Sequence, residues 1–95
     1  MKSHLTVMIY DVTSDRRRDR LHALLKQYGV AVQKSAFEGR LTAAERTQLA
    51  RLVKNLVNAA EDRFVMYTIP PAHEQRILEV GLPRPEIRNP DWYII

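Results

Sequence analysis

The chain has 95 residues, long enough for one small globular domain, and its hydrophobic content of 45% excludes a disordered protein. It contains no cysteine, which excludes a disulfide framework and a thiolate metal site, and no apolar run reaches the roughly 18 residues of a membrane span. The net charge is +4, and we expect a soluble, cytoplasmic protein without a membrane partner.

The first predicted elements are a strand and a basic helix. Residues 5–10 are apolar at odd and even positions alike, which predicts a strand that is covered on both faces. Thr13 or Ser14 can cap the helix that follows. From Leu21 onward, apolar residues with i, i+3, i+4, i+7 spacing predict one buried helix face, and Gly29 predicts the helix end.

Extended and helical segments alternate in the second half of the chain. Residues 30–41 are expected to be extended, either as a tight hairpin or as one bent strand. A capping box at residues 42–45 begins a helix that runs to about Ala59. Residues 63–69 are apolar at both parities and predict another strand. Residues 76–81 predict a shorter strand, with a helical turn as the alternative.

The order β-α-β-β-α-β predicts an α+β fold of the ferredoxin-like type, in which both helices cover one face of an antiparallel sheet. We assign this domain to residues 1–81, and a C-terminal extension with a proline-rich connection and a terminal strand to residues 82–95. Because the strands at 5–10 and 63–69 are apolar on both sides, the second face needs a cover, and we expect a homodimer that packs sheet against sheet. The apolar chain end either closes the edge of its own sheet or docks on a partner chain; it consists of Trp92, Tyr93, Ile94 and Ile95.

Asp11 is the first candidate for chemistry, because a lone carboxylate ends an apolar strand. A carboxylate in this position could bind a hard cation such as Mg²⁺, and two copies brought together by a twofold axis would form a better site than one. The alternative is that Asp11 caps or salt-bridges the basic helix behind it.

The candidate nucleic-acid-binding residues follow Asp11 in the sequence. All of the excess positive charge lies in residues 14–40, which hold seven Lys/Arg and three Asp/Glu, whereas the rest of the chain holds eight of each sign. Arginine forks match phosphate oxygens, so this segment predicts phosphate binding with little base preference, although a solvated helix face would have the same composition. The candidates are Arg16, Arg17, Arg18, Arg20, Lys34 and Arg40, with Phe37 either stacking on a base or belonging to the core.

Four stretches of the sequence together resemble one protein family. They read "VMIYDVTSDRRRDRLHALLKQYG", "VQKSAFEGRLT", "FVMYTIP" and "ILEVG", and they are similar to the CRISPR-associated endoribonuclease two family, the small partner of the CRISPR integrase. The resemblance implies a ferredoxin-like homodimer in which Asp11 of each chain is a ligand of Mg²⁺, or Mn²⁺. It also implies catalytic roles for Asp11, Arg18 and Arg20, and it matches Phe37 to the family's aromatic residue. Ala31 stands where many members carry a basic residue.

The resemblance further implies a role in CRISPR adaptation. The dimer would hold duplex DNA between two integrase dimers during spacer acquisition, with residues 92–95 docked on the integrase. Three functions remain open: a metal-dependent nuclease acting on RNA or DNA, a non-catalytic nucleic-acid-binding scaffold, and a ribonuclease toxin of the same fold. The scaffold is favoured, because the positive charge is segregated, the chain ends on apolar residues, and Ala31 weakens the expectation of cleavage.

Overall fold

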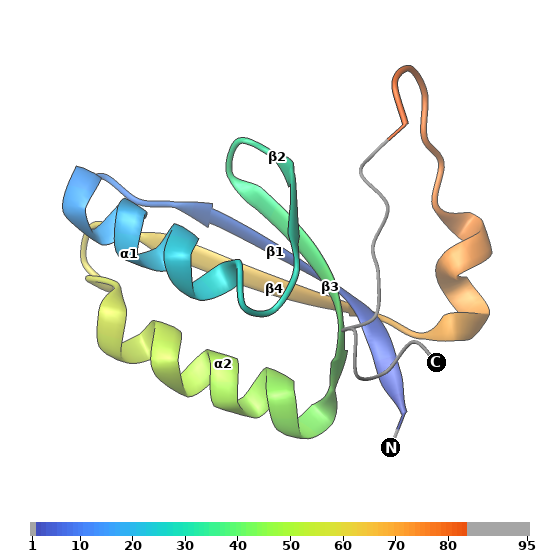
Figure 1. Ribbon diagram of the computed structural model, residues 1–95, viewed down its shortest axis with the longest axis horizontal. Helices are drawn as coiled ribbons and strands as arrows, with labels where there is room; N and C mark the ends of the chain where they lie inside the picture. The colour runs from blue at the N-terminus through green and yellow to red at the C-terminus, as the bar shows by residue number, and fades with distance from the viewer. Residues whose placement is uncertain (1, 84–95) are drawn as a thin grey trace.

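Residues 2–83 are described by a computed structural model, in which a four-stranded sheet carries two helices on one face (Figure 1). Its elements in chain order are β1 (Ser3–Asp11), α1 (Asp15–Leu25), β2 (Val30–Gln33), β3 (Ala36–Thr42), α2 (Ala43–Leu56), β4 (Arg63–Ile69) and the short 3-10 helix η1 (Pro71–Arg76). The predictions for residues 84–95, including the apolar chain end, lie outside the described residues. Within 2–83, no helix is long and apolar enough to cross a membrane.

The sheet has the strand order β2-β3-β1-β4, and every neighbouring pair is antiparallel. This order, with a helix after β1 and another after β3, is that of the ferredoxin-like fold, so the predicted fold is confirmed. Residues 30–41 form the hairpin rather than the bent strand, because Lys34 and Ser35 form the turn that joins β2 to β3. The strands β3 and β1 lie in the centre of the sheet, and β2 and β4 form the edges.

The core lies between the sheet and the two helices. Met8 and Phe37 face each other across the β1–β3 ladder, and both side chains are 0% exposed. Alternate residues of β1 point to this side, so only one of its two apolar faces contributes to the core. The remaining buried members of this cluster are Tyr10, Val12, Leu21, Leu25, Leu41, Leu49 and Val53.

Both predicted helix starts are present. The Ser14 hydroxyl accepts a hydrogen bond from the backbone N–H of Arg17 at 3.2 Å, so Ser14 rather than Thr13 is the N-cap of α1. At the start of α2, the backbone N–H of Thr42 donates to the Glu45 carboxylate at 2.8 Å, and the Glu45 N–H donates to the Thr42 hydroxyl at 3.2 Å. The reciprocal bonds are the predicted capping box.

The α1–β2 connection packs against β3 at a distance that only glycine permits. A Cβ atom on Gly39 would lie 2.1 Å from the carbonyl oxygen of Tyr28, and one on Gly29 would lie 2.2 Å from the carbonyl oxygen of Glu38. Because backbone atoms occupy both positions, neither clash could be relieved by rotating a side chain. The two glycines therefore fix how closely the end of α1 approaches the sheet.

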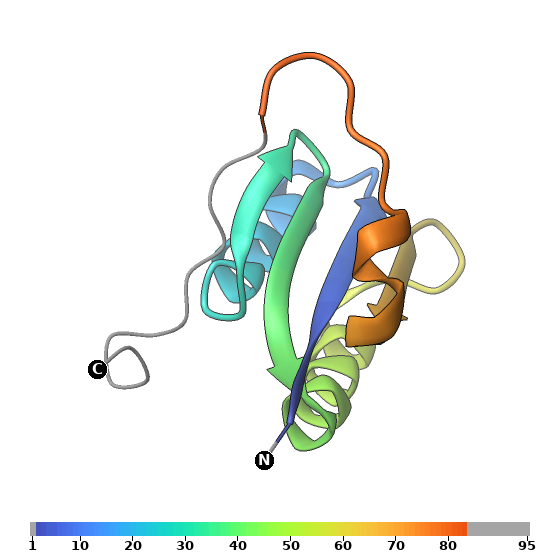
Figure 2. The same ribbon diagram turned by 90° about the vertical axis from the view of Figure 1, so that its right-hand side faces the viewer.

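The second face of the sheet is only partly covered. Figure 2 shows η1 beside β1 at one end of the sheet, and Leu5, on the face away from the helices, is 0% exposed there. Further along, Ile9 and Tyr67 remain 41% and 54% exposed. They lie on the same face because Ile9 faces Val65 in the β1–β4 ladder and Tyr67 faces Val7.

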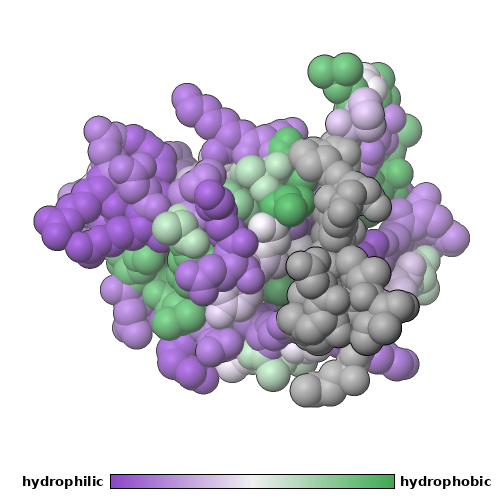
Figure 3. Space-filling view, in the orientation of Figure 1, coloured by the Kyte–Doolittle hydropathy of each residue, from purple (hydrophilic) through white to green (hydrophobic). Residues whose placement is uncertain are grey.

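The predicted strand at 76–81 is wrong for the single chain. Helix η1 continues to Arg76, and residues 77–80 have no regular secondary structure. The segment has no neighbouring strand to pair with among residues 2–83, and Leu78, Val80 and Leu82 are 85%, 89% and 94% exposed. In Figure 3 this segment is the hydrophobic surface at the upper right, while hydrophilic side chains cover α1 on the left.

Candidate nucleic-acid and metal site

A hollow of about 610 Å³ lies where β1 ends. It brings together three of the predicted site residues, Asp11, Arg18 and Lys34, from β1, α1 and the β2–β3 turn. The other residues that line it are Ile9, Tyr10, Val12 and Ser35. One carboxylate and two cations at the mouth of a hollow form an arrangement that can hold a metal ion and a phosphate group together.

Asp11 is the last residue of β1, and its side chain is exposed. Among residues 2–83 its carboxylate has neither a hydrogen-bond partner nor a salt-bridge partner. The alternative that Asp11 caps or salt-bridges the basic helix is therefore wrong: Ser14 caps α1, and Asp15 pairs with Arg18. The Asp11 carboxylate is left available to an external ligand.

Arg18 is held over the end of β1 by its own neighbours. Its Nη1 donates to the carbonyl oxygen of Val12 at 2.9 Å, and its Nη2 forms an ion pair with Asp15. The side chain remains 43% exposed. These two bonds fix the guanidinium where Arg18 lines the hollow, while the side chain stays open to solvent.

Tyr10 supports the hollow from beneath. Its hydroxyl donates to the carbonyl oxygen of Lys34 at 3.3 Å, and its backbone N–H donates to that of Ser35 at 3.1 Å. Burial raises the pKa of the Tyr10 phenol, and the Arg18 guanidinium offsets part of that rise. The β2–β3 turn is thereby tied to the strand that carries Asp11, and Lys34 is exposed beside it.

The structure does not bring all the predicted arginines to the hollow. Arg16 and Arg20 are exposed on α1 and form no ion pair within residues 2–83, so they remain candidates for phosphate contacts. Arg17 is instead paired with Asp62 and Glu61, at 2.7 Å and 3.1 Å. Its guanidinium is therefore already paired with carboxylates of the same chain.

Phe37 and Arg40 are also placed away from the hollow. Phe37 is 0% exposed, and its ring packs edge-on against His22 at a centroid distance of 5.1 Å, so it belongs to the core and cannot stack on a base. Arg40 forms a two-bond ion pair with Glu74 of η1, with both N–O distances at 3.0 Å. Successive side chains of a strand point to opposite faces of the sheet, so Phe37 lies on the face that the helices cover and Arg40 lies on the other face, beside η1.

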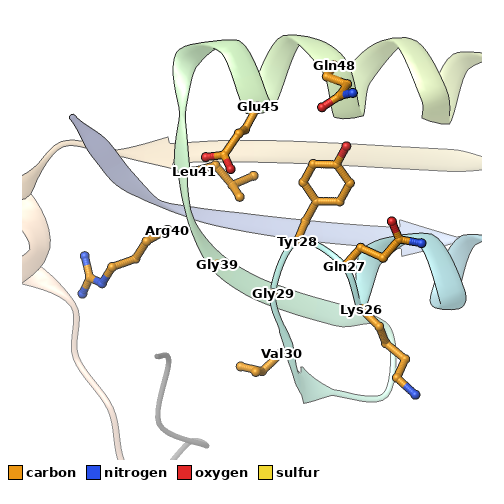
Figure 4. Close-up of a pocket in the computed structure, with 10 residues that line it drawn as sticks. All are labelled: Lys26, Gln27, Tyr28, Gly29, Val30, Gly39, Arg40, Leu41, Glu45 and Gln48. Atoms are coloured by element: carbon orange, nitrogen blue, oxygen red, sulfur yellow. The ribbon is translucent and has the colours of Figure 1, made fainter. Parts of the chain in front are cut away.

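A separate pocket of about 550 Å³ lies at the end of α1 (Figure 4). Arg40 is the only predicted site residue that lines it, and Figure 4 shows its guanidinium pointing away from Tyr28 and Gln48. The remaining lining includes Lys26, Gln27 and Glu45. This pocket therefore does not gather the predicted acidic and basic side chains, whereas the hollow at Asp11 does.

Arg63 is a cation near Asp11 that the sequence patterns did not indicate, although it does not line the hollow itself. It faces Asp11 directly in the β1–β4 ladder and is exposed. Residues opposite each other in an antiparallel ladder lie on the same face, so Arg63 adds positive charge to the end of the sheet that carries Asp11. The available signal was the antiparallel pairing of two predicted strands, but their register could not be assigned from apolar patterns alone.

The donor chemistry at Asp11 fits one ligand of a divalent cation. An exposed carboxylate without a partner is the oxygen ligand that Mg²⁺ prefers. Within residues 2–83, however, no group of three or more His, Cys, Asp or Glu side chains could hold a metal ion. One chain thus supplies Asp11 alone, and the other ligands would have to be waters, phosphate oxygens or groups of another chain.

The fold and this site define a class: a small ferredoxin-like domain with an arginine and a carboxylate at the end of its first strand, the carboxylate having no partner within residues 2–83. The family described as CRISPR associated protein Cas2 matches residues 4–77. The chain therefore belongs to this family, which confirms the resemblance seen in the sequence.

Relatives and solved structures agree with this assignment. The chain is 40% identical over 81 residues to "CRISPR-associated endoribonuclease Cas2" of a Thermus thermophilus strain, covering 85% of this chain and 86% of that protein. It is 38% identical over 89 residues to "CRISPR-associated endonuclease Cas2 2" of a second strain of T. thermophilus, covering 94% and 96%. The crystal structure of a hypothetical protein TT1823 from T. thermophilus superposes with a TM-score of 0.76 at 30% identity, covering 90% of this chain and 99% of that chain.

Proposed function

We propose that the protein is a homodimeric, nucleic-acid-binding component of CRISPR adaptation, in which the hollow at Asp11 binds the phosphate backbone together with Mg²⁺ or Mn²⁺. The observation that carries this proposal is the unpartnered Asp11 carboxylate beside the oriented Arg18 guanidinium and the exposed Lys34. Two cationic side chains favour a polyanion, and the free carboxylate favours a cation that bridges it to a phosphate.

The homodimer is supported by the uncovered face of the sheet. Ile9 and Tyr67 expose 41% and 54% of their surfaces on a face that no element of residues 2–83 covers at that point. A second copy packed on this face would remove these side chains from water and bring two Asp11 residues toward one axis. Two carboxylates at one axis would complete the ligand set that a single chain lacks.

The segment at 77–83 also supports a second copy of the chain as the partner of this sheet. Leu78, Val80 and Leu82 alternate as exposed apolar residues along a chain with no regular structure. Within residues 2–83 no strand pairs with the outer edge of β4, and a hollow of about 400 Å³ lies between α2 and β4, lined by Val53, Phe64 and Met66 among others. An extended segment with alternating apolar side chains can add to such an edge, so we assign the edge of β4 to residues 77–83 of the second copy.

The biological role that we infer is that of a scaffold. Exposed Arg16 and Arg20 on α1, with Lys34 and Arg63 near Asp11, give the dimer cationic surfaces for duplex DNA. In this role the dimer would bridge integrase subunits during spacer acquisition, with residues 92–95 as the docking segment. Deleting 92–95 should abolish association with the integrase while leaving the dimer intact in sedimentation; an unchanged complex would refute this docking.

Phosphodiester cleavage is the second candidate activity, and the free Asp11 carboxylate favours it. A bound Mg²⁺ would supply Lewis-acid charge and lower the pKa of a water molecule. Asp11 would hold the metal, and Arg18 would stabilise the negative charge on the non-bridging phosphate oxygens while a water oxygen forms a bond to phosphorus and the bond to the leaving sugar oxygen breaks. The proton that the water loses would pass through solvent to the leaving oxygen. The relatives' names, endoribonuclease and endonuclease, describe this activity in those proteins.

The substitution Asp11→Asn tests the proposal, since it removes the charge and keeps the shape. We expect Mn²⁺ binding and any metal-dependent cleavage to be lost, while the dimer and its metal-free binding of a short duplex persist. Asp19→Asn, on the exposed surface of α1, is the matched control. Retained Mn²⁺ affinity in Asp11→Asn would exclude the metal site, and loss of spacer acquisition with dimer and integrase complex intact would exclude the purely structural role.

A further inference from the structure

Asp62 occupies the last position before β4; the residue is partly exposed, but its carboxylate is enclosed. Its side chain is 0% exposed. One carboxylate oxygen accepts from the backbone N–H of Thr13 at 3.1 Å and from Arg17 Nη2 at 3.2 Å; the other accepts from Arg17 Nε at 2.7 Å and from the backbone N–H of Asn58 at 2.9 Å. An enclosed carboxylate with N–H donors on both oxygens is a fixed point in the structure.

The segments that Asp62 holds are those that carry the candidate site. Thr13 follows Asp11 by two residues, and Arg17 directly precedes Arg18 on the first turns of α1. Arg18 in turn donates to the carbonyl oxygen of Val12, which lies between Asp11 and Thr13. The β1–α1 connection is therefore anchored by the α2–β4 turn, which is 49 positions away in sequence at the Thr13 contact.

We propose that Asp62 is a positioning residue, which fixes the β1–α1 connection and the start of α1 so that Asp11 and Arg18 face the hollow together. The inference rests on the proposed function and adds a residue to that site. Asp62 itself touches neither metal nor nucleic acid, since its oxygens are enclosed and occupied. Glu61 is a poorer anchor, because its carboxylate is 57% exposed and its contacts with Thr13 Oγ1 and Arg17 are 3.3 Å and 3.1 Å.

The test compares Asp62→Asn with Glu61→Gln in the full-length protein. Hydrogen exchange at the Thr13 amide reports the anchor, and exchange at the Met8 amide reports general stability. Mn²⁺ titration followed by the paramagnetic relaxation of water reports the site. For Asp62→Asn we expect faster exchange at Thr13, unchanged exchange at Met8, and a loss of Mn²⁺ affinity of about tenfold, as for partners that orient metal ligands. Glu61→Gln should change the affinity by less than about twofold.

Each outcome decides a separate point. Unchanged Mn²⁺ affinity in Asp62→Asn overturns the inference, and so does equal acceleration of exchange at Thr13 and Met8, which would mean general loss of stability. Absence of Mn²⁺ binding in the wild type overturns the proposed metal site and, with it, this role for Asp62. If Asp62→Asn does not fold, Arg17→Lys replaces it, because lysine keeps the charge but loses the two-bond geometry; the same expected results and the same refutations then apply.

Discussion

Arg40 and Glu74 form a two-bond ion pair, with Nη1–Oε2 and Nη2–Oε1 distances of 3.0 Å, which ties η1 to the sheet. Both side chains are partly enclosed, at 35% and 25% exposure. The pair lies where η1 covers one end of the sheet face opposite the helices, so we expect a structural function rather than a phosphate contact.

The first prediction follows from this pair. Arg40→Ala and Glu74→Ala should each lower the free energy of unfolding by about 1 kcal/mol, and neither should change duplex affinity at fixed salt. Urea unfolding and fluorescence anisotropy measure the two quantities. If Arg40→Ala weakens duplex binding while Glu74→Ala does not, Arg40 contacts nucleic acid in spite of its ion pair.

The salt dependence of duplex binding distinguishes the arginines of α1 that are proposed to contact phosphate from other exposed arginines. The triple substitution Arg16→Ala/Arg18→Ala/Arg20→Ala should reduce the slope of log affinity against log salt by up to about 2.7, since each lost phosphate contact lowers it by about 0.9. Arg51→Ala is the control, because Arg51 is exposed on α2 without an ion pair in residues 2–83. An unaltered slope in the triple variant would move the binding surface elsewhere.

Arg63 makes a narrower test of the same surface. Because it faces Asp11 across the β1–β4 ladder, Arg63→Ala should weaken duplex binding and lower the salt slope by about 0.9, the effect of one phosphate contact. Anisotropy titrations at several salt concentrations measure both. An effect no larger than that of Arg51→Ala would show that the guanidinium does not reach the backbone.

The proposed dimer is tested by placing charge on the face of the sheet that carries Ile9 and Tyr67. Tyr67→Asp should convert the dimer to single chains in sedimentation velocity at micromolar concentration, because an unpaired carboxylate would be enclosed at the interface. Leu52→Asp is matched in exposure, with 40% for Leu52 against 54% for Tyr67, but it lies on α2, and it should leave the dimer intact. Dissociation by Leu52→Asp alone would place the interface on the helical side.

The pH dependence of stability follows from Asp62. The hydrogen bonds from Arg17 hold the pKa of the Asp62 carboxyl well below its usual range, against an opposing effect of burial. The unfolded chain binds a proton on this group near pH ~3.9, so the stabilisation is complete above that pH and is lost as the pH falls toward the lower folded-state pKa. The stability difference between wild type and Asp62→Asn should be constant from about pH 7 to about pH 5 and shrink below about pH 4. A difference that is already lost at about pH 6 would contradict this assignment.

Local patterns predicted the parts of the fold that depend on neighbours in sequence. A cap at Thr13 or Ser14, the capping box at Thr42 and the strand that ends at Asp11 each follow from spacing within a few residues, and the structure selects Ser14 as the cap. The sequence pattern predicts that α2 runs to about Ala59, but the helix ends at Leu56. It ends there because Asn58 forms the turn that follows: the Asn58 N–H donates to Asp62, and the Asn58 side chain accepts from the N–H of Ala60.

Contacts between residues far apart in the sequence could not be predicted from local patterns. Arg17 looks like any member of the arginine cluster in the sequence, yet it pairs with Asp62, 45 positions away. Lys34, by contrast, reaches the hollow at Asp11 because the hairpin turn folds back beside the end of β1, a consequence of topology rather than of spacing. The sequence could therefore indicate the chemistry at Asp11 and Arg18 but not which of the other basic residues would be free to join it.

The edge of β4, which no strand of residues 2–83 pairs with, and the alternately apolar segment at 77–83 bear on how copies of the chain would associate in the proposed dimer. If two chains exchange these segments reciprocally, both edges are satisfied and the assembly closes at two. If each chain instead lends its segment to the next, every added copy leaves a new edge open, and the same contacts propagate a filament without limit. In the proposed dimer, face-to-face packing of the sheets would select closure over polymerisation, and variants that weaken that face should be examined for fibres as well as for monomers.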